Sequence, residues 1–183
     1  MRRSARRRRT VTAYRNGDTI VVLIPARFTR AEEREWVKRM VDRLDARERR
    51  ARRGDADLAA RAERLAKAYL DGAAGAPVRP ASVRWVSNQQ TRWGSCTPTD
   101  RTIRLSNRLQ GMPTWVIDYV LLHELTHLKV PGHGPDFWSL VESYPRTEKA
   151  RGFLDGVSFA TGNPQWQDDE SDVDEAEPEH GTA

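Results

Sequence analysis

The sequence predicts an α+β fold in which a small antiparallel sheet lies beside several helices. Three observations support this prediction. A β-hairpin signal stands near the N-terminus, apolar residues at helical spacing follow it, and short strand-like segments precede an apolar helical segment near residue 120. The 183 residues are enough for one compact domain or for a domain with a smaller appendage.

The hairpin signal consists of two β-branched segments, Thr10–Tyr14 and Thr19–Ile24, separated by Asn16-Gly17-Asp18. An Asn-Gly pair between such segments is typical of a tight antiparallel turn. Thr29 then stands three residues before Glu32, which is the spacing of a capping box. A helix is therefore predicted to begin at Thr29.

That helix has an apolar face formed by Trp36, Val37, Met40, Val41 and Leu44. Beyond this face it becomes almost wholly charged up to Arg53, and we expect Gly54 to interrupt it. Asp55 can cap a second helix with Leu58, Ala62, Leu65 and Tyr69 on one side. The Gly-, Ala- and Pro-rich segment Asp71–Pro80 is predicted to be a loop.

The second half of the chain begins with strand patterns, at Val83–Ser87, Arg92–Cys96 and Thr102–Leu105. Pro113 suits the first turn of a helix that runs to about Lys129. Pro131-Gly132 stops this helix, and a further helix is predicted from Pro135 through Val141.

Charge is divided unevenly along the chain. Residues 1–9 contain six arginines, whereas residues 164–183 contain eight acids and no Lys or Arg. Neither end can bury enough apolar surface to offset the entropy of ordering, so we expect a disordered basic arm at 1–9 and a disordered acidic tail at 164–183. Between them we expect a hairpin and helical region at 10–80 and a second folded region at 81–163. The basic body favours polyanions such as nucleic acid, bound by the arm and the helix Arg30–Arg53, or the chain's own tail.

Composition also bears on the compartment. No segment approaches the roughly 20 apolar residues that span a bilayer, so no membrane association is predicted. Cys96 is the single cysteine, which excludes an internal disulfide and fits a reducing compartment. We therefore expect a cytoplasmic protein.

The most informative segment is His123-Glu124-Leu125-Thr126-His127, followed by His133. On a helix, His123 and His127 lie on one face, and the Pro131-Gly132 break lets His133 return to the same point. Three neutral imidazoles can hold Zn²⁺ while a fourth position stays open to water. Glu124 is rotated by about 100° from His123, so it can act on that water as a general base. The pattern predicts a zinc-dependent metallopeptidase or amide hydrolase.

Other roles for these residues stay open. A structural zinc site would need a fourth protein ligand, such as Cys96 or His180. Glu142 could replace His133 as the third ligand, and Glu124 could be an ordinary surface carboxylate. The side chain that stabilises developing negative charge cannot be ranked among the candidates, which are Tyr119, Tyr144 and the nearby arginines.

Five blocks of the chain, in order, resemble one known family. They are Arg92-Trp93-Gly94-Ser95-Cys96, Ile103-Arg104-Leu105-Ser106-Asn107, Ile117-Asp118-Tyr119-Val120, His123–His127, and His133 with Phe137-Trp138. Together they are similar to the YgjP-like predicted metal-dependent hydrolases, which are relatives of the SprT-like zinc metallopeptidases, over about residues 82–155.

This resemblance implies a compact zincin-like core, in which a β-strand above the active-site helix lines the substrate cleft. It also implies that His123, His127 and His133 bind the metal, that Glu124 is catalytic, and that the substrate is a protein or peptide. The Trp93-Gly94 pair is compatible with core packing or with substrate contact. Two other functions remain as alternatives: a basic nucleic-acid-associated module, which could act on DNA-bound proteins as SprT-like relatives do, and a zinc-binding protein without activity.

Overall fold

The chain divides into an N-terminal unit, residues 1–53, and a C-terminal unit, residues 54–183. The computed structural model describes residues 2–4, 6, 9–17, 19–72 and 76–162. The boundary between the units falls at residue 53, whereas the sequence favoured a boundary near residue 80. The predicted acidic tail, with His180, lies outside the described residues.

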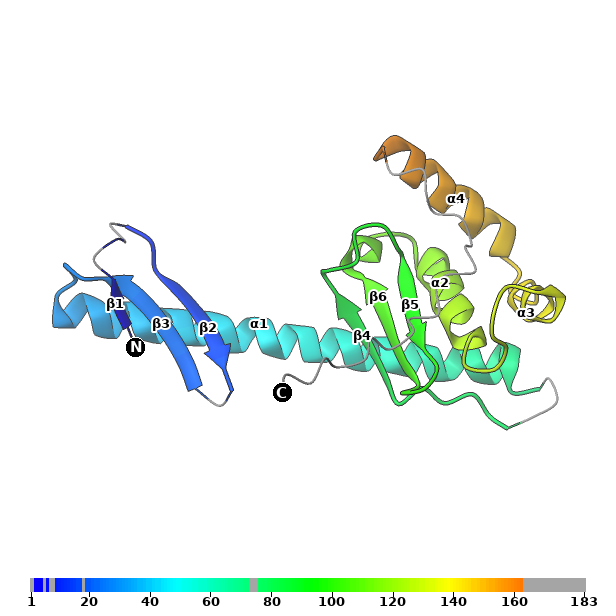
Figure 1. The fold of residues 1–183 in the computed structure, drawn as a ribbon, viewed down its shortest axis with the longest axis horizontal. Coiled ribbons are helices and arrows are strands. Elements are labelled where there is room, and N and C mark those ends of the chain that lie inside the picture. Colours follow the sequence, from blue (N-terminus) through cyan, green and yellow to red (C-terminus); the bar gives the residue numbers. More distant parts are fainter. Residues whose placement is uncertain (1, 5, 7–8, 18, 73–75, 163–183) are drawn as a thin grey trace, which may run out of the picture. The chain divides into compact units, whose positions relative to one another are not determined.

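The N-terminal unit contains a three-stranded sheet with the strand order β1-β3-β2 (Figure 1). β2 (Thr12–Asn16) and β3 (Thr19–Pro25) are antiparallel, with Asn16 opposite Thr19. Gly17 has a positive φ of 57°, which glycine adopts without steric cost. The predicted hairpin is therefore confirmed.

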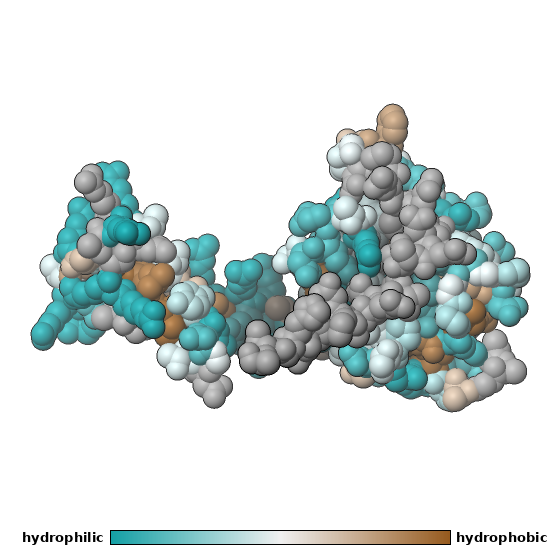
Figure 2. Space-filling view, in the orientation of Figure 1, coloured by the Kyte–Doolittle hydropathy of each residue, from teal (hydrophilic) through white to brown (hydrophobic). Residues whose placement is uncertain are grey.

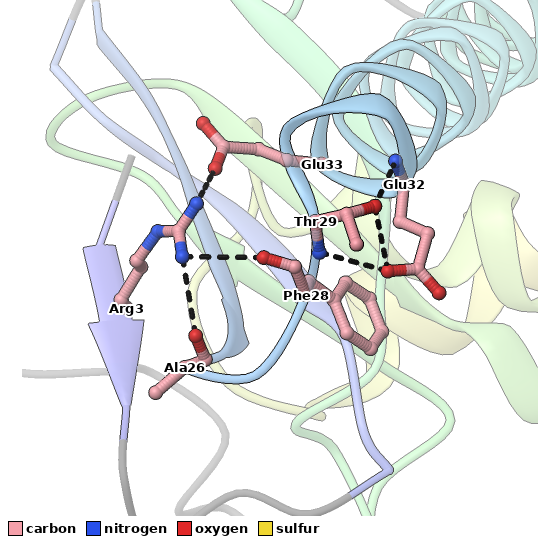
Figure 3. Close-up of polar contacts among 6 residues, drawn as sticks. All are labelled: Arg3, Ala26, Phe28, Thr29, Glu32 and Glu33. Atoms are coloured by element: carbon pink, nitrogen blue, oxygen red, sulfur yellow. Dashed lines mark hydrogen bonds and ion pairs between the residues drawn. The ribbon is translucent and has the colours of Figure 1, made fainter.

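β1 (Arg2–Ser4) pairs in parallel with β3 and lies within the basic arm for which the sequence predicted disorder. Arg3 anchors it, because its guanidinium donates to the carbonyl oxygens of Ala26 (3.1 Å) and Phe28 (3.2 Å) and forms an ion pair with Glu33 (Figure 3). A strand of three residues leaves no periodic pattern in a sequence, and these partners are more than twenty residues away.

A capping box opens the following helix, as predicted (Figure 3). The backbone N–H of Thr29 donates to the Glu32 carboxylate at 2.8 Å, and the N–H of Glu32 donates to Thr29 Oγ1 at 3.2 Å. These two reciprocal bonds satisfy donors that the first helical turn leaves without partners. The Thr29 backbone N–H and, more weakly, the Thr29 hydroxyl, which also donates to the carboxylate at 2.8 Å, hold the pKa of the Glu32 carboxyl below its ordinary value.

α1 (Arg30–Leu65) is continuous, so the predicted interruption at Gly54 is wrong. A helical glycine costs only about 1 kcal/mol relative to alanine, which the flanking turns tolerate. Asp55 caps no second helix; its carboxylate instead accepts a hydrogen bond from the Trp85 N–H at 2.9 Å. The predicted apolar side of this segment is present, with Leu58, Ala62 and Leu65 buried. A short π-helix, η1 (Ala66–Leu70), extends it.

The C-terminal unit contains a second three-stranded sheet, β4 (Ser82–Val86), β5 (Gly94–Thr97) and β6 (Thr102–Ser106), in the order β4-β6-β5. β5 and β6 are antiparallel, as expected, but β4 pairs with β6 in parallel. The α+β class is confirmed, with mixed sheets instead of a purely antiparallel one. The 3₁₀ turn η2 (Asn107–Leu109) follows β6.

Three helices complete the C-terminal unit: α2 (Thr114–Thr126), α3 (Pro135–Val141) and α4 (Thr147–Ala160). α3 has the predicted bounds, and α4 was not predicted. α2 is buried along most of its length, because it contacts β5 and β6 on one side and α3 and α4 on another (Figure 1). Packing on both sides therefore restricts the conformations of the buried side chains of α2.

The visible surface of the described residues is mostly hydrophilic, with hydrophobic residues in small separate patches (Figure 2). Among the helices that the structure describes, none is long and apolar enough to cross a membrane.

Candidate active site

The end of α2 carries the histidine motif. His123 and Glu124 lie in its last turn, and His127 is the C-cap residue, so the helix ends three residues before the predicted Lys129. Tight turn bonds follow, from the Leu128 N–H to the Leu125 carbonyl (3.1 Å) and from Lys129 to Thr126 (2.9 Å). Gly132 then adopts a positive φ of 71°, which permits the chain reversal that was predicted there.

This reversal brings His133 back to the other two histidines. The His123 Nε2 atom lies 3.3 Å from His127 Nε2 and 3.0 Å from His133 Nε2. In this set, one ligand atom from each of the three residues lies within 4.8 Å of the others. Nitrogens bound tetrahedrally to zinc at about 2.0–2.1 Å lie about 3.3 Å from one another. The spacing of the three imidazoles is therefore compatible with one shared metal ion.

The protonation state of the rings also fits a metal. Burial, followed by the neighbouring His127, His133 and Arg151, places the pKa of His123 well below its ordinary value. Burial and the nearby His133 lower the pKa of His127 to about 4. Both rings are therefore neutral at pH 7, and a neutral ring nitrogen has the lone pair that a metal needs.

Aromatic packing orients the three rings. The buried Phe137 ring lies 4.8 Å from His123, 4.6 Å from His127 and 4.6 Å from His133, measured between ring centroids. Metal-binding histidines usually donate their second ring nitrogen to an acceptor. Among the described residues, the buried Nδ1 atoms of these three histidines have no hydrogen-bond partner. Phe137 therefore packs against all three imidazoles and limits how far each ring can rotate.

Glu124 is buried between α2 and β5, with 4% of its surface exposed. A Cβ atom added at Gly94, the first residue of β5, would lie 2.5 Å from Glu124 Oε1 and 2.9 Å from its Cδ. Real Cβ atoms essentially never approach another atom so closely. Glycine at position 94 therefore makes room for the Glu124 carboxylate, which excludes Glu124 as an ordinary surface residue.

The Trp-Gly-Ser-Cys block thus combines two roles. Trp93 belongs to the core, with 1% of its surface exposed and the Arg108 guanidinium 4.1 Å above its ring. Gly94 serves the site itself, because strand and helix approach each other there. The sequence contained the block, but only the structure shows which side chain stands opposite the glycine.

The alternative ligands lie apart from the three histidines. Glu142 is exposed and is not part of the histidine cluster. Cys96 is buried but does not belong to the cluster either, and burial, followed by the nearby Glu124 charge, raises its thiol pKa to about 12. Such a thiol is protonated at pH 7, in a form that binds metal poorly. Among the described residues, the cluster contains His123, His127 and His133.

The side chains that could stabilise negative charge on the substrate lie in different surroundings. The Tyr144 hydroxyl donates to the Trp115 carbonyl oxygen at 3.3 Å, away from the histidines. Tyr119 is fully buried, with its ring 6.2 Å from the His123 ring. Arg151, on α4, lies 4.8 Å from the centre of the Trp138 ring, which itself lies 6.0 Å from His133.

The charge of Arg151 also contributes to the lowered pKa of His123, after burial and the two other histidines. The sequence did not single it out from the many other arginines. A helical spacing from Thr147 would have been the only signal, and α4 itself was not predicted.

Two buried histidines four residues apart with a glutamate between them, joined by a third histidine from the following loop, are typical of a metal-dependent hydrolase. Residues 11–156 match the family described as YgjP-like, metallopeptidase domain, and because this span covers most of the chain, the chain belongs to that family. It is therefore a metallopeptidase of the YgjP-like family. The sequence-based recognition of the family is confirmed.

Two further comparisons were made. No curated protein matches the chain. Among solved structures, the chain is similar to the metallopeptidase zymogen of Pyrococcus abyssi abylysin, with 24% identity and a TM-score of 0.44. The alignment covers 58% of this chain and 94% of that one.

Proposed function

We propose that this chain is a zinc metallopeptidase in which His123, His127 and His133 hold the ion and Glu124 is the general base. The observation that carries the proposal is the convergence of three imidazoles, two of them buried, with ring nitrogens at the spacing of tetrahedral zinc ligands. Membership of a metallopeptidase family supports the same reading and makes a peptide or protein the substrate.

Zinc, when bound, would supply Lewis acidity that lowers the pKa of a water molecule to about 7 and polarises the scissile carbonyl. Glu124 removes the proton of the attacking water as its oxygen bonds to the carbonyl carbon. The same carboxyl then delivers this proton to the nitrogen as the C–N bond breaks, so that a carboxylic acid and an amine are formed. The absence of a side chain at Gly94 leaves room for the carboxylate in this position.

Negative charge develops on the substrate carbonyl oxygen during this attack. We propose Arg151 as the side chain that stabilises it, because its charge is felt at His123 and its guanidinium lies over Trp138 beside the histidines. Tyr144 is a weaker candidate, since its hydroxyl is engaged with the Trp115 carbonyl. We propose further that the substrate extends along β5, which ends the β4-β6-β5 strand order next to α2.

Glu124→Gln tests the general base. The amide cannot take up a proton, so cleavage of casein or of a quenched fluorescent peptide should fall about 10²–10⁴-fold. Zinc content, measured by elemental analysis, should stay at the wild-type level because the three imidazoles remain. Glu142→Gln is the matched control, since Glu142 is exposed and lies outside the cluster. Cleavage by a folded, metal-free sample would refute the proposal.

The alternative of a zinc protein without activity would need a fourth protein ligand, and the cluster found among the described residues offers only three. The nucleic-acid alternative rests on the exposed arginines of the N-terminal unit. It is tested together with the inference below.

A further inference from the structure

A groove in the N-terminal unit, distant in the sequence from the histidines, has a volume of about 850 Å³. One side is formed by residues 11–13 at the start of β2, and the other by α1. We propose that this groove binds an acidic peptide segment that also carries apolar side chains. The inference does not depend on the proposed peptidase activity.

The rim of the groove is positively charged. Arg43, Arg47 and Arg50 line it, and their spacing of four and three residues places them on one face of α1. All three side chains are exposed, and no carboxylate lines the groove. Like charges at i,i+4 repel by about 0.2–0.5 kcal/mol per pair, so an anionic partner would relieve a repulsion within the helix.

Some other arginines of the same unit are paired with acids. Arg15 forms ion pairs with Glu48 (2.9 Å) and Asp45 (3.6 Å), and Arg39 with Glu35 (2.7 Å). Within the described part of the chain, Arg43, Arg47 and Arg50 take part in no ion pair. These three arginines therefore bring positive charge to the rim of the groove, and no carboxylate among the described residues lining the groove offsets that charge.

The floor of the groove is apolar. Met40 and Leu44 contribute from α1, and Val11 and Ala13 from the other side, each of them half-buried. Methionine adapts its shape to different partners. An apolar side chain of a partner would cover these apolar residues, and carboxylates of the same partner would pair with the arginines of the rim. A segment with both kinds of residue satisfies both requirements.

A nucleic acid would supply negative charge for the rim of the groove but no apolar side chain for its floor. Single strands are usually bound by stacking bases on aromatic rings, and no aromatic side chain lines this groove. The phosphates of a nucleic-acid duplex are bound by arginines and make no use of an apolar floor. The combination of floor and rim therefore favours an acidic, partly apolar peptide over a nucleic acid.

The test uses the full chain carrying Glu124→Gln, so that a bound peptide is not cleaved. The probe is a fluorescein-labelled 16-residue peptide of glutamates interspersed with leucines, followed by fluorescence anisotropy. The triple variant R43A/R47A/R50A should raise the Kd at least 10-fold. Leu44→Gln, which retains every charge, should raise the Kd at least 3-fold. Circular dichroism establishes that each variant is folded.

The matched control is R49A/R52A/R53A, which removes the same charge from exposed positions of α1 that do not line the groove. It should change the Kd less than 2-fold. An equal loss in both triple variants would show non-specific charge attraction and overturn the proposal. If R43A/R47A/R50A failed to fold, Arg47→Glu would take its place, and an unchanged Kd would refute the groove.

Nucleic acid is the competing occupant. A fluorescein-labelled single-stranded 16-nucleotide DNA is titrated under the same conditions. Tighter binding of this DNA than of the peptide, lost in R43A/R47A/R50A but kept in Leu44→Gln, would replace the peptide site by a nucleic-acid surface.

Discussion

The N-terminal unit buries three hydrophobic side chains among its described residues, Val21, Val22 and Ile24, whereas the C-terminal unit buries a continuous cluster from Leu58 to Leu154. The first unit relies on strand pairing, a capping box and exposed ion pairs, such as that between Arg3 and Glu33. Each exposed pair contributes at most about 1 kcal/mol, whereas a buried leucine contributes several times more.

The difference in core size between the two units matches the different functions that we propose for them. Catalysis needs side chains held within a fraction of an ångström, and the candidate site lies in the unit with the larger buried cluster. Recognition of a peptide tolerates adjustment, and the groove lies in the unit with the smaller core. The following predictions test this contrast between the two units.

Phe137→Ala should have the largest effect. Removing a buried ring that contacts all three histidines should cost about 3–5 kcal/mol of unfolding free energy in the C-terminal unit. It should also weaken zinc binding, because the imidazoles lose their packing surface. Urea unfolding and zinc titration measure the two effects. A loss of stability with unchanged zinc affinity would show that Phe137 does not orient the rings.

Gly94→Ala should reduce peptide cleavage about 100-fold, since a displacement of about 1 Å in a catalytic group costs that much. The added methyl group would overlap the Glu124 carboxylate, and neither strand nor helix can move away within a packed core. Zinc content should not change. Gly152→Ala is the control, because a Cβ there meets no atom within 4 Å. Equal activity of the two variants would contradict this role of Gly94.

Thr29→Ala should destabilise the start of α1 by about 1 kcal/mol, because the capping bond to the Glu32 N–H is lost. Hydrogen exchange of the amides near residue 30 should accelerate about 5-fold, and peptide cleavage should be unchanged. A comparable acceleration throughout the C-terminal unit would mean that the two units unfold together.

Gly54→Ala should have the smallest effect, a stabilisation of about 0.5–1 kcal/mol measured by thermal unfolding. Gly54 lies inside continuous α1, and a Cβ there would contact Trp85 Cδ1 at 3.5 Å, an ordinary distance. A destabilised variant would show that the helix needs glycine at this boundary between the units.

Local patterns in the sequence predicted several elements correctly. The Asn16-Gly17 turn, the Thr29–Glu32 capping box and α3 each depend on residues within a few positions of one another. The same holds for His123 and His127, and the Pro131-Gly132 break added His133. The structure brings these three together, while their binding of zinc and the role of Glu124 remain proposals.

Other features depended on distant partners. β1 pairs with β3, and Arg3 bonds to residues beyond position 25. In the second sheet, β6 lies between β4 and β5, and β4 pairs with it in parallel. Gly54 stays helical because the turns on both sides support it. No local pattern contains this information.

The sequence by itself determined the family, the α+β class and the order of the metal-binding motif, since residue type and short spacing encode them. Tertiary structure alone decided that Gly94 faces Glu124, that Phe137 packs against three imidazoles and that Arg151 lies over Trp138. Those relations join separate strands and helices, whose approach depends on how the whole core packs.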